Sequence, residues 1–281
     1  MTIWFITGAS TGLGRALTEI VLEKGDTAIA TVRRPELLSD LSAKYPAGRL
    51  LILKLDVSKP QEIIDAFAAA KEKFGRIDVV ANNAAQGTFG EVETVADADV
   101  RAMFETNFWG AANVSREAVK FFREVNPAGE GGRLLQISSI TGLRGQGAMA
   151  YYSASKFALE GFSEGLASEI DPAWNIKITI VEPGGFDTPG LGKVTWAPAH
   201  VAYSNKELPG NVLRGIWEQF HPKGDARKGM EVVYKLAALE KPPLHFPLGK
   251  DAVGIVRSKT QSLLEDTEKY EPWNEGLERS G

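Results

Sequence analysis

The chain has 281 residues, of which 43% are apolar and 24% are charged, and its formal net charge at pH 7 is −4. This length and composition are typical of one large globular domain, and the slightly acidic charge argues against a nucleic-acid-binding surface. Because the chain contains no cysteine, disulfides and thiolate metal sites are excluded.

The remaining composition narrows the chemistry and the expected location. His200, His221 and His245 lack the spacing of metal ligands, so we expect no metal site. No apolar run approaches the roughly 20 residues that a bilayer requires, so we expect no membrane span. The first strand is expected to begin at Ile3, which leaves no room for a signal peptide and favours a cytoplasmic protein.

Short apolar segments alternate with segments of helical periodicity along the chain. The apolar segments predict strands at residues 3–7, 27–32, 50–55, 78–81, 134–137, 176–181 and 244–246. Apolar stripes at helical spacing predict helices at residues 13–24, 60–75 and 97–125 and around Tyr152. Strands joined by helical crossovers predict an α/β fold in a single domain over residues 1–281. We expect a doubly wound parallel sheet of Rossmann type, with about seven strands and with helices on both faces.

A glycine-rich turn connects the first expected strand to the first expected helix. Residues 7–14 read Thr-Gly-Ala-Ser-Thr-Gly-Leu-Gly, so glycines stand at positions 8, 12 and 14. Glycine lets the backbone approach a ligand closely, and free N–H groups at a helix start attract phosphate. We interpret the turn as a dinucleotide site; a glycine-rich turn without a ligand is the alternative.

Tyr152 and Lys156 stand four residues apart in a helical stretch, which places them on one helix face. A free phenol has a pKa of about 10, and a neighbouring cation favours the phenolate and lowers that pKa. The pair is therefore a candidate proton donor and acceptor. The i+4 residue of Tyr151 is Ser155, which supplies no charge, so we expect Tyr151 to pack or to line the substrate. The alternative is a surface lysine beside a packed tyrosine.

Together with other segments in the same order, these motifs resemble the short-chain dehydrogenase/reductase family. The resemblance covers residues 2–189, and Ala85 departs from the family's usual glycine. The matching segments are Thr7-Gly8-x-x-x-Gly12-x-Gly14, Asp56-Val57, Asn82-Asn83-Ala84-Ala85, Asn107, Ser139, the pair Tyr152 and Lys156, and Pro183-Gly184 followed by Thr188. The chain is similar in particular to a subgroup of carbonyl reductases related to hydroxysteroid dehydrogenases.

The resemblance implies a role for each matching residue. The implied catalytic residues are Asn107, Ser139, Tyr152 and Lys156. The implied cofactor-binding residues are Gly8, Ser10, Thr11, Gly12, Leu13, Gly14, Arg33, Asp56, Val57, Asn83, Ala84, Tyr152, Lys156, Pro183, Gly184 and Thr188. Two assignments stay open on the residues alone, because Ser138 adjoins Ser139 and because Asn107 also suits a solvated helix face.

The implied activity is hydride transfer between NADP(H) and a hydrophobic ketone, aldehyde or secondary alcohol, with Tyr152 as proton donor or acceptor. A catalytically silent NADP-binding regulator on the same fold is the alternative, although such a protein would normally have lost one of the four catalytic residues. A nucleotide-sugar epimerase usually spaces its glycines differently. A methyltransferase has no use for a Tyr-x-x-x-Lys helix.

The end of the second expected strand predicts the cofactor. An enzyme that prefers NAD usually carries an acid there, which binds the ribose 2′-hydroxyl. Here the strand ends in Val32-Arg33-Arg34, and no carboxylate appears before Glu36. The guanidinium of Arg33 suits a 2′-phosphate, so we expect NADP(H) rather than NAD(H). If both arginines are only solvated, the enzyme would accept either cofactor, and Thr11 stands where many NADP-preferring relatives carry a second base.

Residues 189–225 lose clear periodicity, and we expect them to form a substrate lid. Their aromatic and imidazole side chains include Trp196, His200, Tyr203, Trp217 and Phe220. An irregular aromatic segment beside the nicotinamide turn indicates a cover over an apolar pocket, to which Phe89, Leu143, Met149 and Phe186 would add. An ordinary insertion with buried aromatic residues is equally consistent.

The C-terminal tail, residues 250–281, is expected to be largely helical. Val256, Leu263 and Leu264 would pack either on the body of the protein or on a partner subunit, and the sequence does not choose between these. We expect a homodimer or a homotetramer that acts on a small hydrophobic substrate.

Overall fold

The protein folds around a seven-stranded parallel sheet, and the computed structural model describes residues 1–219 and 221–279. The strand order is β11-β7-β6-β4-β1-β2-β3. The bounds are β1 (Ile3–Thr7), β2 (Thr27–Val32), β3 (Leu50–Lys54), β4 (Val79–Asn82), β6 (Gly132–Ile137), β7 (Ile176–Pro183) and β11 (His245–Leu248). The predicted doubly wound α/β sheet is confirmed, including its seventh strand, which pairs with β7.

Alternate residues of the central strand β1 belong to two different hydrophobic cores. Trp4 and Ile6 pack with the helices of one face, whereas Phe5 packs with those of the other. Because both faces are covered, the central strands consist almost entirely of buried residues and lack a polar alternation. The chain crosses from one side of the sheet to the other between β3 and β4, so a crevice opens beyond the ends of β1 and β4.

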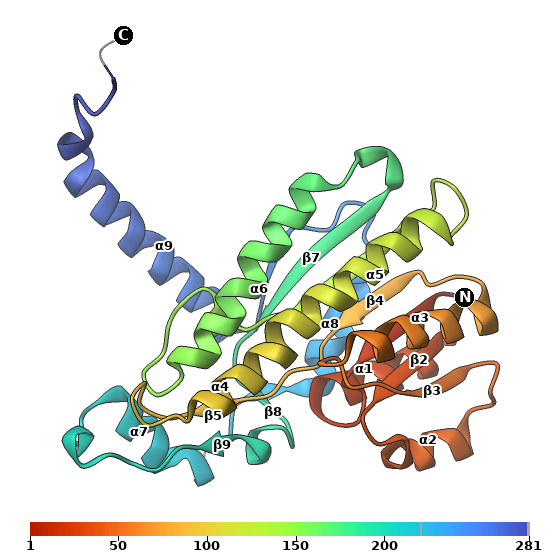
Figure 1. Ribbon diagram of the computed structural model, residues 1–281, viewed down its shortest axis with the longest axis horizontal. Coiled ribbons are helices and arrows are strands. Elements are labelled where there is room, and N and C mark those ends of the chain that lie inside the picture. The colour runs from red at the N-terminus through yellow and green to blue at the C-terminus, as the bar shows by residue number, and fades with distance from the viewer. Residues whose placement is uncertain (220, 280–281) are drawn as a thin grey trace.

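Helices form a layer on each face of the sheet. One layer holds α1 (Gly12–Glu23), α2 (Ser39–Lys44) and α8 (Ala226–Ala237). The other holds α3 (Pro60–Phe74), α5 (Ala111–Glu124) and α6 (Ala150–Glu169). In Figure 1, α5 and α6 run side by side across the sheet, and β7 is seen beside α6.

The long helix predicted over residues 97–125 is divided in three. It consists of α4 (Asp97–Phe104), a π-helical turn η2 (Glu105–Gly110) and then α5. At the end of this turn the chain passes close to the end of β3, since a Cβ at Gly110 would lie 2.8 Å from the carbonyl oxygen of Val57. Single π-helical turns are rare and are frequent at functional sites. This one contains Asn107.

Short elements connect the main ones. The small strands β5 (Thr88–Phe89) and β9 (Thr195–Trp196) pair, as do β8 (Phe186–Asp187) and β10 (Gly224–Asp225). The remaining helix of the lid segment is α7 (Pro209–Ile216). The short 3-10 turns are η1 (Pro35–Leu38), η3 (Ile140–Gly142), η4 (Pro172–Trp174), η5 (Leu191–Lys193), η6 (Val201–Tyr203), η7 (Trp217–Gln219) and η8 (Glu271–Asn274).

The C-terminal helix α9 (Lys250–Tyr270) projects away from the body, as Figure 1 shows. Ala252, in its first turn, is its one buried residue. Leu263 and Leu264 are 53% and 49% exposed, so of the two arrangements expected for them, packing on the body is not observed, and packing on a partner subunit stays a prediction. Within the part of the chain that the structure describes, no helix combines the length and apolar character that crossing a bilayer requires.

Candidate active site

Ser139 and Tyr152 meet beyond the carboxyl end of β6. Ser139 begins the turn η3, where its hydroxyl accepts hydrogen bonds from the backbone nitrogen and the hydroxyl of Thr141, at 3.2 and 3.0 Å. Tyr152 lies in the first turn of α6. Burial raises the pKa of the Tyr152 phenol, and a hydrogen bond with the Ser139 hydroxyl lowers it in part. The phenol is therefore held in the protonated form, which is the form that donates a proton.

Lys156 is buried one turn along α6 from Tyr152. It is 2% exposed, and its ammonium donates a hydrogen bond to the carbonyl oxygen of Ile137 at 2.9 Å. Burial lowers the pKa of Lys156 to about 8, and the Glu160 carboxylate opposes this shift. The ammonium lies 6.0 Å from the centre of the Tyr152 ring. The expected lowering of the phenol pKa is not observed, because burial raises that pKa more than the hydrogen bond with Ser139 lowers it.

Asn107 and Tyr151 make hydrogen bonds that hold α6 against the neighbouring loops. Asn107 is 1% exposed, which excludes the solvated helix face. Its amide nitrogen donates to the hydroxyl of Ser155 and to the carbonyl of Gln86, at 3.1 and 2.9 Å. Its amide oxygen accepts from the backbone nitrogen of Gln86 at 2.9 Å. The Tyr151 hydroxyl donates to the carbonyl oxygen of Val92 at 3.1 Å, so this tyrosine serves packing.

The turn between β1 and α1 fits a pyrophosphate because its glycines leave the backbone uncovered. Gly8 and Gly12 have φ angles of +68° and +60°, a region that favours glycine. A Cβ at Gly14 would lie 2.4 Å from the side-chain nitrogen of Asn83. The side chain of Thr11 makes no capping bond to α1, so N–H groups of the first turn stay available to a ligand. The other turn residues, Ser10 and Leu13, are partly buried.

Segments far apart in the sequence close around this turn. The backbone nitrogens of Asn83 and Ala84, after β4, donate to the hydroxyl of Thr7 at 2.8 and 2.9 Å. Thr188, after β7, lies on the opposite side, where a Cβ at Gly12 would be 3.4 Å from the Cβ of Thr188. The structure thus brings the predicted cofactor residues after β1, β4 and β7 together at one edge of the sheet.

The turn after β7 is held by the start of α9. Pro183 ends β7, and the nitrogen of Gly184 donates to the carbonyl of Leu248 at 2.9 Å. The carboxylate of Asp251 accepts from the nitrogen of Gly185 at 2.6 Å, and a Cβ at Gly184 would lie 2.3 Å from that carboxylate. Only glycine fits position 184. The role of Asp251 was not predicted, because this residue lies 66 residues from its partner.

The residues predicted to contact the adenosine half of the cofactor lie beyond β2 and β3. The Asp56 carboxylate accepts from the nitrogen and the hydroxyl of Ser58, at 3.1 and 2.7 Å, and Val57 is 5% exposed. Arg33 is exposed directly after β2. Its guanidinium forms no hydrogen bond or ion pair with any residue in the ranges 1–219 and 221–279. A cation without a partner therefore stands where an NAD-preferring enzyme usually carries an acid.

An aromatic cluster, formed by Phe89, Trp196 and Trp217, lies beside Tyr152. The ring of Phe89 packs edge-on against Tyr152, with centroids 5.7 Å apart. Trp196 and Trp217 lie 5.5 and 5.3 Å from Phe89 and 5.6 Å from each other. Two aromatic residues of the segment 189–225 therefore reach the neighbourhood of the phenol. Phe220, which the sequence grouped with them, lies outside the described residues.

Phe186 does not join the aromatic cluster. It packs with the core on the α8 face of the sheet, and a Cβ at Gly229 or Gly224 would lie 2.6 or 2.8 Å from its ring. The expectation that Phe186 lines the substrate pocket is therefore wrong. Its place on β8, which pairs with β10, turns the ring toward α8, a result of tertiary pairing that local sequence does not reveal.

An ion pair fastens the lid segment to the body. Glu91 is 7% exposed, and its carboxylate accepts from Arg214 at 2.8 Å. Arg214 also donates to the carbonyl of Ala197 at 2.7 Å, and its guanidinium carbon lies 4.7 Å from the ring centre of Trp196. The sequence did not indicate this contact, since 123 residues separate the partners.

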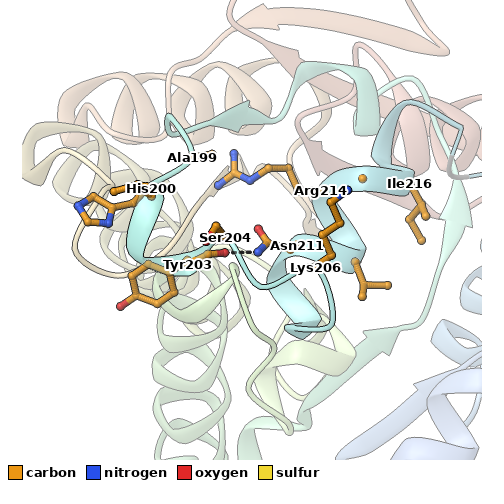
Figure 2. A pocket seen from close by; sticks show the side chains of 11 residues that line it. Ala199, His200, Tyr203, Ser204, Lys206, Asn211, Arg214 and Ile216 are labelled. Atoms are coloured by element: carbon orange, nitrogen blue, oxygen red, sulfur yellow. Dashed lines mark hydrogen bonds between the residues drawn. The ribbon is translucent and has the colours of Figure 1, made fainter.

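A cavity of about 700 Å³ lies within the lid segment itself. Figure 2 shows its lining, in which Asn211 is hydrogen bonded to the backbone of Tyr203 and Arg214 stands at the rim. His200 also lines this cavity rather than the space beside Tyr152. None of the four predicted catalytic residues contributes to it, so we do not regard this cavity as the catalytic site.

A second buried group lies behind Lys156, formed by Glu160, Glu182 and His245. The ring nitrogen Nδ1 of His245 lies 2.7 Å from Glu182 and 3.7 Å from Glu160. One ligand atom from each lies within 4.8 Å of the others, so the three side chains could hold a metal ion. Sequence reasoning missed the group, although Glu160 stands four residues after Lys156, a spacing that would have placed it on the same helix face.

The comparisons with known proteins agree with the geometry. A family model described as short chain dehydrogenase matches residues 2–197. An oxidoreductase of Schizosaccharomyces pombe is 40% identical over 266 residues, which cover 94% of this chain and 87% of that protein.

Two solved structures extend the likeness to the fold. A short-chain dehydrogenase from Streptomyces avermitilis has a TM-score of 0.88 and 35% identity, and the match covers 99% of this chain and 98% of the other. A short chain dehydrogenase from Burkholderia cenocepacia, in complex with NADP, has a TM-score of 0.72 and 26% identity, with coverage of 95% and 96%. With its glycine turn, its Ser139–Tyr152–Lys156 site and these matches over most of its length, this chain belongs to the short-chain dehydrogenase family of oxidoreductases.

Proposed function

We propose that this protein transfers a hydride between NADP(H) and a hydrophobic ketone, aldehyde or secondary alcohol, with Tyr152 as proton donor and acceptor. One observation carries the proposal: Tyr152, Ser139 and Lys156 meet beyond the end of β6, with the aromatic cluster beside Tyr152 and the glycine turn beyond the end of β1 in the same parallel sheet. A polar reaction centre thus shares one edge of the sheet with the glycine turn and adjoins an apolar wall.

The side chains have separate tasks in the reductive direction. The nicotinamide of the bound cofactor supplies the hydride. The Ser139 hydroxyl holds the substrate carbonyl oxygen against the phenol, and Tyr152 gives its proton to that oxygen as negative charge develops there. Lys156, when charged, stabilises the phenolate that remains. Asn107 keeps α6 in position through Ser155 and Gln86.

The apolar wall supports a hydrophobic substrate. Phe89, Trp196 and Trp217 present ring surface near Tyr152, which favours an apolar group beside the reacting carbonyl. We propose that residues 189–225 act as the lid over it, fastened by the ion pair of Glu91 and Arg214. The test is a panel of aryl and alkyl ketones, aldehydes and secondary alcohols, followed by cofactor absorbance. No turnover with any of these compounds would contradict the proposed function.

The preference for NADP(H) is supported by the end of β2, where Arg33 is exposed and unpaired among the described residues and Val32 takes the place of the acid. A hydrogen bond from a guanidinium to a phosphate contributes about 1.5–3 kcal/mol. We therefore expect kcat/KM to be roughly ten- to a hundredfold higher with NADPH than with NADH.

Arg33→Ala should bring that ratio close to one without changing kcat/KM for NADH. Arg34→Ala is the matched control, since Arg34 is equally exposed one residue further on. Equal kcat/KM values for the two cofactors in the unaltered protein would contradict the assignment.

We also propose that the chain self-associates as a dimer or tetramer. Large apolar side chains stand exposed on the body and on the C-terminal turn η8, among them Trp109 at 53%, Phe157 at 44% and Trp273 at 78%. Exposed apolar surface of this kind favours burial against a partner. The mass of the protein in solution, measured by light scattering, tests this.

A further inference from the structure

The helix α6 carries a titratable side chain at every fourth position from Tyr152: Lys156, Glu160 and Glu164 follow. This spacing places them in one line along the helix. Lys156 and Glu160 are 2% and 3% exposed, whereas the side chain of Glu164 is 53% exposed. The line therefore runs from the candidate active site, through a buried carboxylate, to the surface.

Glu160 meets two further titratable groups from neighbouring strands. Glu182, on β7, is completely buried and lies 2.7 Å from Nδ1 of His245, on β11. The same nitrogen lies 3.7 Å from Glu160, and Nε2 of His245 lies 3.4 Å from Glu164. From α9, Asp251 is hydrogen bonded to Gly185 instead.

Among the described residues, the buried carboxylates of this group have too few hydrogen-bond donors, although one oxygen of Glu182 is paired with Nδ1 of His245. Both oxygens of Glu160 and one oxygen of Glu182 are buried without a partner among the described residues. A buried negative charge is costly unless a proton or a nearby cation compensates it. Lys156, one turn before Glu160 on α6, is the nearby cation, so the charges of Lys156, Glu160 and Glu182 depend on one another.

The group also touches the segment that carries Ser139. Three consecutive residues at the end of β6 contact different groups of the site. The carbonyl oxygen of Ile137 accepts a hydrogen bond from Lys156, and the Ser139 hydroxyl is hydrogen bonded to the Tyr152 phenol. The Ser138 hydroxyl lies beside the Glu160 carboxylate and lowers its pKa. The Ser138 Oγ and one carboxylate oxygen of Glu160 would each lie 2.8 Å from a Cβ at Gly142. The carboxylate of Glu160 is thus part of the wall behind the reaction centre.

We propose that the buried carboxylate of Glu160, held in a cluster with Glu182 and His245, keeps Lys156 charged during turnover, which makes Glu160 a positioning residue for the reaction. This inference rests on the proposed function, because it takes Lys156 as the group that stabilises the Tyr152 phenolate.

The direction of each pKa shift agrees with this coupling. Burial raises the pKa of Glu160 to about 7, and Glu182 raises it as well, whereas Ser138, His245 and Lys156 lower it. Burial lowers the pKa of Lys156 to about 8, and Glu160 opposes that shift. Burial therefore shifts the two pKa values toward one another, and the charge of each group influences the pKa of the other. Removal of the negative charge at position 160 therefore lowers the pKa of Lys156 further.

A bound metal ion explains the arrangement of Glu160, Glu182 and His245 less well than a shared proton does. The distance of 2.7 Å between His245 and Glu182 is that of a hydrogen bond, which a shared proton explains. The ammonium of Lys156 already supplies positive charge next to Glu160, and it would repel a divalent cation.

The test is the pH dependence of kcat/KM for reduction, with a ketone from the substrate panel. We expect activity to fall above about pH 8 in the unaltered protein, as Lys156 loses its proton. Glu160→Gln should move this alkaline limb to lower pH by about one unit, and Glu160→Asp should keep it near its original place.

Glu169→Gln is the matched control, because it removes a charge from an exposed position near the end of the same helix. An unshifted limb in a folded Glu160→Gln protein would overturn the inference while leaving the proposed function intact. If no compound is turned over, the pKa of Lys156 is measured by NMR of lysines carrying carbon-13 at Cε, with Lys156→Arg for assignment. A Lys156 pKa that is equal in the unaltered protein and in Glu160→Gln would overturn the inference. If a compound is turned over, loss of that activity on treatment with a chelator would overturn it as well.

Discussion

At the scale of single residues, burial decides which of the polar side chains act as acids or bases. The phenols of Tyr151 and Tyr152 are chemically identical, but only Tyr152 lies beside Ser139 and Lys156. Tyr151 uses its hydroxyl to hold the carbonyl of Val92. The environment therefore gives one tyrosine a candidate role in proton transfer and the other a role in packing.

Tyr152→Phe should lower kcat by about a hundredfold to ten-thousandfold, the usual contribution of a positioned acid or base, with little change in the Kd of NADPH. Tyr151→Phe removes one partly exposed hydrogen bond and should lower kcat less than about tenfold. Steady-state kinetics and cofactor titration by fluorescence measure both. A larger loss in Tyr151→Phe would reverse the assignment.

At the scale of elements, two small irregularities shape the site. The π-helical turn η2 places the buried amide of Asn107 where it can bind both Ser155 on α6 and Gln86 after β4. The pairing of β5 with β9 brings Trp196 to Phe89, so a two-residue strand sets the position of the lid. Neither feature has the length of a regular element, yet each joins segments that are distant in the sequence.

Trp196→Ala should raise KM for an aryl ketone about tenfold, which corresponds to about 1.4 kcal/mol, because it removes a ring from the apolar wall beside Phe89. The Kd of NADPH should stay within about twofold, since Trp196 does not adjoin the glycine turn. His200→Ala, in the same segment but outside the aromatic cluster, is the matched control. Unchanged kinetics across the panel, in a stably folded variant, would make the segment an ordinary insertion.

At the scale of the whole molecule, the sheet and its two helix layers form one body, and α9 stands apart from it. Beyond Thr260 every residue whose exposure is described is exposed, so the distal tail contributes no buried apolar contacts to the body. A segment of this kind does not stabilise the protomer on which it begins.

Deletion of residues 261–281 should therefore change the free energy of unfolding by less than about 0.5 kcal/mol at low protein concentration. Chemical denaturation measures the change, and light scattering of both proteins shows whether assembly depends on the tail. A loss of more than about 2 kcal/mol at low concentration would show that the tail packs on the body after all.

The sequence by itself determined the fold class and the identity of the motifs. Buried parallel strands require continuous apolar runs, a glycine turn before a helix is a local motif, and a Tyr-x-x-x-Lys pair is fixed by helical spacing. All of these depend on residues within a few positions of one another. The candidate catalytic residues were chosen in this way, through local motifs in a family order.

Only the tertiary structure decided what surrounds those residues. Three contacts join segments that are distant in the sequence. They are the cluster of Glu160, Glu182 and His245, the ion pair of Glu91 with Arg214, and the hydrogen bond that Asp251 accepts from the turn after β7. The pKa of a phenol or of a lysine depends on burial and on such neighbours, so the raised value at Tyr152 could not be read from the i+4 spacing. Whether Leu263 and Leu264 of α9 pack on the body or on a partner subunit was likewise undecided, because their spacing suits either arrangement. Only the tertiary structure shows that both are exposed on the protomer.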